Sequence, residues 1–104
     1  MARRRSLAVW YYRDAQQVEV DFVLTGGGHG EVVEAKWAEH ADARDARGVR
    51  ELLATARARG SKELAHARGW VVCRTVEPHP LAGEGPRVEA VSLPGFIARL
   101  GEGG

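Results

Sequence analysis

Three residues near the start of the chain have types and a spacing suited to metal-dependent chemistry: Asp21, Glu34 and Lys36. Mg²⁺ prefers carboxylate oxygens, and it usually takes one or two of them and completes its octahedron with water or phosphate. A neighbouring lysine can orient a water or stabilise the charge that develops on a phosphate. If the fold brings these side chains together, they predict hydrolysis of a phosphate ester assisted by Mg²⁺ or Mn²⁺.

The elements that must position them are strands of an antiparallel meander. Residues 7–13 are rich in aromatic and aliphatic side chains, and residues 18–25 and 31–37 alternate between apolar and polar side chains. Polar residues 14–17 and the glycine-rich residues 26–30 separate these segments and predict turns.

The apolar alternation also predicts how the second and third strands pair. If partners have residue numbers that sum to 55, Phe22 faces Val33 and Asp21 lies opposite Glu34, with Cβ atoms roughly 4.5 to 5.5 Å apart. A shift by one residue would mix charged and apolar faces. The other apolar residues expected on the face of Phe22 are Val18, Val20, Leu24, Ala35 and Trp37.

Three accessory residues are expected on the face of the carboxylates. Glu19 would lie opposite Lys36, and if residue 13 pairs with residue 18, Trp10 lies opposite Asp21 and Tyr12 opposite Glu19. The aromatic rings could then stack on nucleobases. An alternative interpretation is an ordinary outer sheet face, in which Glu19 and Lys36 form a surface ion pair that contributes less than about 1 kcal/mol.

The second half of the chain predicts a crossover to a parallel strand. An apolar stripe over 42–59 indicates an amphipathic helix, with Asp42 as a candidate N-cap and Gly60 as its end. Arg44, Arg47 and Arg50 are expected on its solvent-exposed edge. Residues 69–75 form a continuous apolar run, as in a strand buried on both faces and paired in parallel.

The remaining elements complete an α/β fold. A short helical piece is expected over 61–67, a loop over 76–87, a strand over 88–93 and a terminal helix over 94–100. The predicted architecture is a mixed sheet with an antiparallel three-strand meander, a crossover helix and a further parallel strand.

Composition restricts the class of protein. The 104 residues fit a single domain, 44% of them are hydrophobic, and the net charge of +1 gives no overall basic field for nucleic acid. A single cysteine, Cys73, excludes an internal disulfide and is expected in the core. No apolar run approaches the ~20 residues that span a bilayer. We expect a cytoplasmic protein without a membrane partner.

The spacing Asp21, twelve residues, Glu34-Ala35-Lys36 resembles the signature of the PD-(D/E)xK nuclease-like superfamily. The longer series WYYRD, EVDFVL, EVVEAKW, ARDARGVREL and GWVVCR is similar to the uncharacterised C-terminal domain of prokaryotic AAA+-type ATPases. This resemblance implies a restriction-endonuclease-like core that hydrolyses DNA phosphodiester bonds with Mg²⁺. It implies that Asp21 and Glu34 are metal ligands and that Lys36 positions or activates the attacking water.

The sequence departs from the resembled superfamily in one respect, and it leaves two alternatives open. Superfamily members commonly have a further acidic residue on a helix before the first strand, whereas only MARRRS precedes that strand here. A missing helix would leave an apolar sheet face exposed, which predicts self-association. The leading hypothesis is a DNA nuclease-like domain; the alternatives are a non-catalytic module that binds nucleic acid or an AAA+-type ATPase, and a residual fragment without its own function.

Overall fold

A computed structural model describes residues 8–13, 19–26, 29–62, 64 and 66–102. Six strands form one sheet in the order β1-β2-β3-β4-β6-β5. The strands are β1 (Ala8–Arg13), β2 (Glu19–Gly26), β3 (His29–Ala35), β4 (Arg68–Val72), β5 (His79–Pro80) and β6 (Val88–Val91). The helices are α1 (Arg47–Ala58) and α2 (Leu93–Glu102).

The sheet is antiparallel on one side and parallel on the other. Strands β1, β2 and β3 form the antiparallel meander, and β3, β4 and β6 run parallel. Helix α1 makes the crossover from β3 to β4, and the two-residue strand β5 adds an antiparallel edge to β6. The predicted mixed α/β fold is therefore confirmed.

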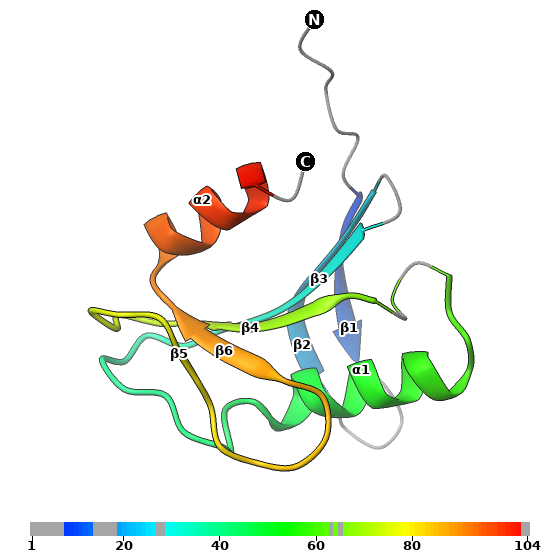
Figure 1. Cartoon of the computed structure of the whole chain (residues 1–104), viewed down its shortest axis with the longest axis horizontal. Helices are drawn as coiled ribbons and strands as arrows, with labels where there is room; N and C mark the ends of the chain where they lie inside the picture. The colour runs from blue at the N-terminus through cyan, green and yellow to red at the C-terminus, as the bar shows by residue number, and fades with distance from the viewer. Residues whose placement is uncertain (1–7, 14–18, 27–28, 63, 65, 103–104) are drawn as a thin grey trace, which may run out of the picture.

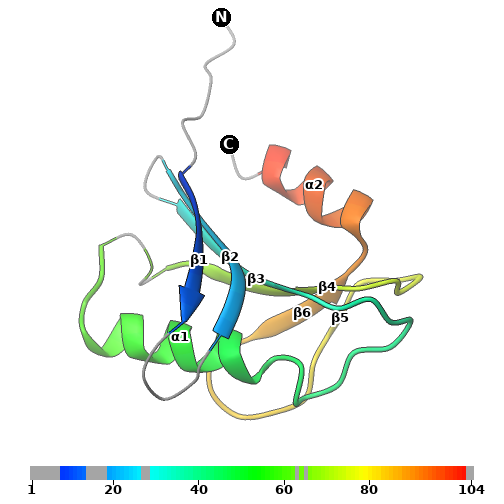
Figure 2. The same cartoon turned by 180° about the vertical axis from the view of Figure 1, so that it is seen from behind.

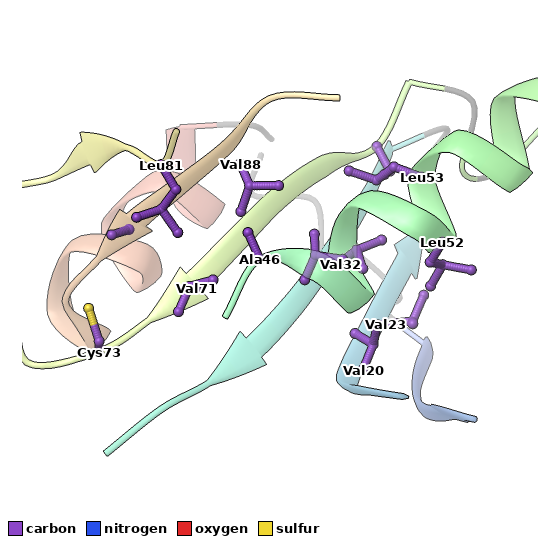
Figure 3. Close-up of a cluster of buried hydrophobic side chains, with 13 residues drawn as sticks. Val20, Val23, Val32, Ala46, Leu52, Leu53, Val71, Cys73, Leu81 and Val88 are labelled. Atoms are coloured by element: carbon purple, nitrogen blue, oxygen red, sulfur yellow. The ribbon is translucent and has the colours of Figure 1, made fainter. Parts of the chain in front are cut away.

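The two helices lie on opposite faces of the sheet (Figures 1 and 2). The α1 face contains the larger core, a buried cluster that includes helix residues such as Leu53 and strand residues such as Val71 (Figure 3). Cys73 is buried in this core, as predicted. The α2 face contains a smaller buried cluster of Val33, Trp70, Val91 and Phe96.

The predicted pairing of β2 with β3 is confirmed, because Phe22 pairs with Val33. The predicted single apolar face on β2 is wrong. Val20 and Val23 both belong to the α1-face core, whereas Leu24 packs on the α2 face. The pairing of β1 with β2 shifts between Trp10 and Tyr12, where β2 has one extra residue. This β-bulge interrupts the alternation of β2, so that Val20 lies on the same face as Val23.

The predicted partners of β1 are wrong, by one residue at Arg13, which pairs with Glu19 in place of residue 18, and by one more residue beyond the bulge. Trp10 pairs with Val23 and Tyr12 pairs with Val20, rather than with Asp21 and Glu19. The side chains of Trp10, Tyr12 and Glu19 lie outside the part that the structure describes, and so does Val18. Thus their predicted accessory roles receive no support from this pairing.

The limits of several elements differ from the predicted ones. Strand β3 ends at Ala35, so Trp37 follows the strand and is 89% exposed. Helix α1 begins at Arg47, and its N-cap residue Ala46 makes no side-chain capping bond, so Asp42 is not the N-cap. The described residues between Gly60 and Arg68 form turns in place of the expected helical piece.

The end of α1 is as predicted. Gly60 has a φ of +67°, and the N–H groups of Gly60 and Ser61 donate to the carbonyl oxygens of Arg57 and Ala56. This is a Schellman motif, which favours glycine because other residues are strained at positive φ.

Arg50 corrects the expectation of a fully solvated arginine edge. Its guanidinium donates to the carbonyl oxygens of Leu81 at 2.6 Å, Ala82 at 2.7 Å and Pro86 at 3.2 Å. The side chain therefore holds the 76–87 loop against α1, whereas Arg47 forms an exposed ion pair with Glu51 on the same helix.

Candidate functional site

Asp21 and Glu34 lie where β2 and β3 meet at the carboxyl end of β3. The Phe22–Val33 pair is one register step away from them. The backbone N–H of Ala35 donates to Asp21 Oδ2 at 2.9 Å, so the aspartate side chain takes up a β3 donor beside the bulge. Because Ala35 directly follows Glu34, the Asp21 carboxylate lies within one peptide unit of Glu34. Both side chains are partly exposed.

Lys36 is held by a carboxylate that neither the motif nor its alternative interpretation included. Its Nζ lies 2.6 Å from Asp45 Oδ1, with side chains 38% and 16% exposed respectively. Asp45 lies in the turn before α1, so the crossover segment rather than the hairpin fixes the lysine ammonium group.

Hydrogen bonds within the turn that precedes α1 hold the side chain of Asp45. Its Oδ2 accepts the backbone N–H of Asp42 at 2.7 Å, and Asp42 Oδ1 accepts the N–H of Arg44 at 2.9 Å. The side-chain hydrogen bond from Arg44 is the main cause that lowers the pKa of Asp42 below its ordinary value. Asp42, the expected helix cap, thus stabilises the turn that presents Asp45 to Lys36.

The donor set around Asp21 and Glu34 suits a hard cation in its chemistry. Two carboxylates are the number that Mg²⁺ commonly takes from a protein, with water and phosphate oxygens in the other positions. Within the described residues, no group of three or more His, Cys, Asp or Glu side chains is arranged to hold a metal. An ion here would depend on two protein side chains and on oxygen ligands from outside the chain.

A cavity of about 610 Å³ opens at the carboxyl ends of the three parallel strands. Residues that follow each strand line it, including Lys36 and Trp37 after β3, Arg74 after β4 and Leu93 after β6. Phe22, 46% exposed, lines the side next to β2. Lys36 therefore lies two residues after Glu34 in the sequence and also lines this cavity.

Comparison with known families gives one result. A family model described as a domain of unknown function, DUF4143, matches residues 1–96. The chain belongs to this family. A search of curated proteins found no match. The membership agrees with the expected kinship to an uncharacterised domain. Within the described part of this DUF4143 domain, no helix is long and apolar enough to cross a membrane.

A second carboxylate on β3 of the DUF4143 domain has a different environment. Glu31 accepts hydrogen bonds from Arg68 Nε at 2.9 Å and from Trp70 Nε1 at 2.7 Å, and its side chain is 5% exposed. The guanidinium groups of Arg68 and Arg99 lie 5.4 and 5.7 Å from the Trp70 ring centroid. This cluster joins β3, β4 and α2 near the amino ends of the parallel strands.

Glu31 and Asp45 are the two carboxylates that sequence reasoning missed. Glu31 did carry a signal, since it shares its strand face with Val33 and Ala35, and a charge on an apolar face needs a buried partner. Asp45 carried none, because its contact with Lys36 depends on where the crossover segment returns to the sheet.

Proposed function

We propose that this DUF4143 domain is a Mg²⁺-dependent nuclease-like domain of the PD-(D/E)xK type that hydrolyses DNA phosphodiester bonds. The observation that supports this most is the hydrogen bond from Ala35 to Asp21, which holds one motif carboxylate beside the Glu34-Ala35-Lys36 segment. The three motif residues thus occupy the end of one hairpin, which the proposed chemistry requires.

Each of these side chains has a defined role in the proposal. Asp21 and Glu34 hold the ion, and the backbone donor at Ala35 keeps the Asp21 carboxylate oriented. When bound, Mg²⁺ lowers the pKa of a coordinated water and offsets negative charge on the phosphate. Lys36 positions the attacking water or contacts the phosphate, and Asp45 keeps its ammonium group at the end of β3.

The Lys36–Asp45 ion pair also favours a second candidate function, a non-catalytic module that binds nucleic acid or an AAA+-type ATPase. A lysine engaged by the crossover segment can serve as a fixed cation for a phosphate without any catalysis. In that case the carboxylate pair would be retained without hydrolysis.

Cleavage assays separate the two candidates. Linear, flapped and four-way-junction DNA would be incubated with the protein in Mg²⁺ or Mn²⁺, alongside Asp21→Asn and Lys36→Ala. The control variant is Glu89→Gln, which changes a strand glutamate paired with exposed Arg87. We expect cleavage that both site substitutions abolish and the control retains. Absence of cleavage, or cleavage indifferent to both substitutions, would overturn the nuclease proposal in favour of the binding module.

A further inference from the structure

The cavity beside Lys36 occupies the place where open α/β sheets bind ligands. Such sheets bind in the crevice outside the carboxyl ends of their parallel strands. Here the segments that follow β3, β4 and β6 all contribute to its lining, and its volume of about 610 Å³ lies within the usual range for ligand sites. Its position and size therefore indicate a ligand site.

The lining of the cavity is mostly apolar and includes exposed aromatic rings. The apolar lining includes one residue from each of β3, β4 and α2, namely Val33, Val72 and Phe96. Two further lining residues, Phe22 and Trp37, are exposed to solvent. A tryptophan that is 89% exposed beside an apolar cavity makes no contribution to the core of its own domain. The ligand must therefore present a flat or apolar surface.

The charged side chains in the lining are both cationic. They are Lys36, whose ammonium group is paired with Asp45, and Arg74, whose guanidinium lies 5.2 Å from the centroid of the Trp37 ring. Arg74 therefore favours a ligand with negative charge, whereas a two-fold contact with a second copy of this chain through the cavity would bring two Arg74 side chains together. Aromatic rings beside cations are the combination that binds single-stranded nucleic acid, through stacking on bases and attraction of phosphates.

We infer that the cavity binds an unpaired nucleobase, with Trp37 as its stacking platform and Arg74 as a phosphate contact. This inference rests on the proposed function, because Lys36 would link the base site to the phosphodiester site. It names the substrate class of that activity: single-stranded or flapped DNA, in which a base is free to leave the duplex.

Binding measured without cleavage tests this inference separately from the nuclease proposal. An oligothymidylate of about 12 nucleotides would be titrated in EDTA and followed by fluorescence anisotropy, with an abasic strand of equal length and a blunt duplex as comparison ligands. The variants are Trp37→Ala and Arg74→Ala, with Val76→Ala and Arg59→Ala as matched controls. Val76 and Arg59 are exposed and lie outside the cavity lining.

The expected result is a preference for bases on a flexible backbone. Oligothymidylate should bind about tenfold more tightly than the abasic strand, and Trp37→Ala should remove that difference, since a tenfold gain in affinity lies within the usual range for stacking of one base on an aromatic ring. Arg74→Ala should weaken both strands, and the two controls should leave both affinities unchanged. Because binding is measured in EDTA, these differences are expected even if the protein cleaves no DNA.

Three outcomes would overturn the inference. Equal affinity for the abasic strand would show that the protein binds the DNA backbone through its positive charge and does not recognise a base. Tighter binding of the duplex would show that the ligand needs no unpaired base. A synthetic peptide of alternating Leu and Glu that binds through Trp37, with no oligonucleotide binding, would assign the cavity to a protein partner. Thermal unfolding of each variant verifies its fold; if Trp37→Ala were unfolded, the effect of Arg74→Ala on oligothymidylate would decide.

Discussion

Strand β3 carries two glutamates three residues apart, and their surroundings differ in almost every respect. Glu31 is buried near the amino end of the strand, where Arg68 and Trp70 supply its hydrogen-bond donors. Glu34 lies near the carboxyl end, partly exposed, beside an aspartate on the neighbouring strand. One strand therefore presents one carboxylate to the protein interior and another to a place that solvent can reach.

This difference shows how one residue type is assigned to stability or to ligand binding. A buried carboxylate whose donors all come from the protein has no capacity left for an external ligand. Its removal lowers the free energy of unfolding, because its buried donors then lack an acceptor. Partly exposed carboxylates close to one another gain from a cation instead. Glu31 is therefore expected to affect folding, and the Asp21–Glu34 pair to affect binding.

The largest expected effect is the loss of stability in Glu31→Ala. The substitution leaves the buried Trp70 indole N–H without its acceptor and Arg68 without its carboxylate, at a cost of about 2 to 4 kcal/mol. Urea denaturation followed by tryptophan fluorescence would measure it. The control Glu89→Ala, in a more exposed ion pair, should cost less than about 1 kcal/mol. Equal losses in both variants would refute the special role of Glu31.

A smaller loss is expected where the sheet touches α1, away from both carboxylate regions. A Cβ atom added at Gly69 would lie 2.7 Å from Val49 Cγ1 and 2.8 Å from Leu53 Cδ1, two fully buried core atoms that cannot easily move. Gly69→Ala should therefore cost about 1 to 3 kcal/mol through overpacking. The urea midpoint should fall while Mg²⁺ binding at the carboxyl end of β3 stays intact; an unchanged midpoint would contradict the close packing.

Mg²⁺ itself should distinguish the two regions by a still smaller change in stability. An ion that binds only the folded state raises the free energy of unfolding, by roughly 1.4 kcal/mol at ten times its dissociation constant. We expect thermal unfolding in Mg²⁺ rather than EDTA to show this gain for the parent chain and for Glu89→Gln, and not for Asp21→Asn. The same gain in Asp21→Asn would place the ion elsewhere.

The sequence was sufficient to predict the features that depend on local pattern. Alternation in β2 and β3 gave the Phe22–Val33 register, and the apolar run of β4 gave its parallel pairing and burial. The positive φ at Gly60 follows from glycine at the end of an amphipathic stripe. These signals need only neighbours in the chain or one partner strand.

The features that were missed depend on the three-dimensional arrangement. The bulge in β2 places Val20 on the opposite face from Phe22 without any glycine or proline to mark it. Asp45 reaches Lys36 only because the chain folds back between β3 and α1. Trp37, expected within the sheet, is instead exposed at the cavity because β3 ends two residues earlier.

The smallest expected effect concerns the turn that supports Asp45. The Arg44 side chain keeps the pKa of Asp42 below its ordinary value, so the folded state holds this carboxyl ionised at a lower pH than the unfolded chain does. The associated stabilisation is therefore complete above the unfolded pKa of about 4 and is lost as pH falls through the lower folded value. Arg44→Ala should raise the Asp42 pKa toward the ordinary value, as measured by carboxyl NMR titration.

The matched variant Arg47→Ala removes an arginine that pairs with Glu51 on α1, and it should leave the Asp42 titration unchanged. This pair of variants tests whether the support of Lys36 is built within the turn or transmitted from the helix. If Arg47→Ala moved the Asp42 pKa and Arg44→Ala did not, the helix would hold Asp45 in place. The position of Lys36 beside Asp21 and Glu34 would then depend on the same α1 packing that stabilises the core. A change in that packing would affect both the stability of the fold and the candidate binding site.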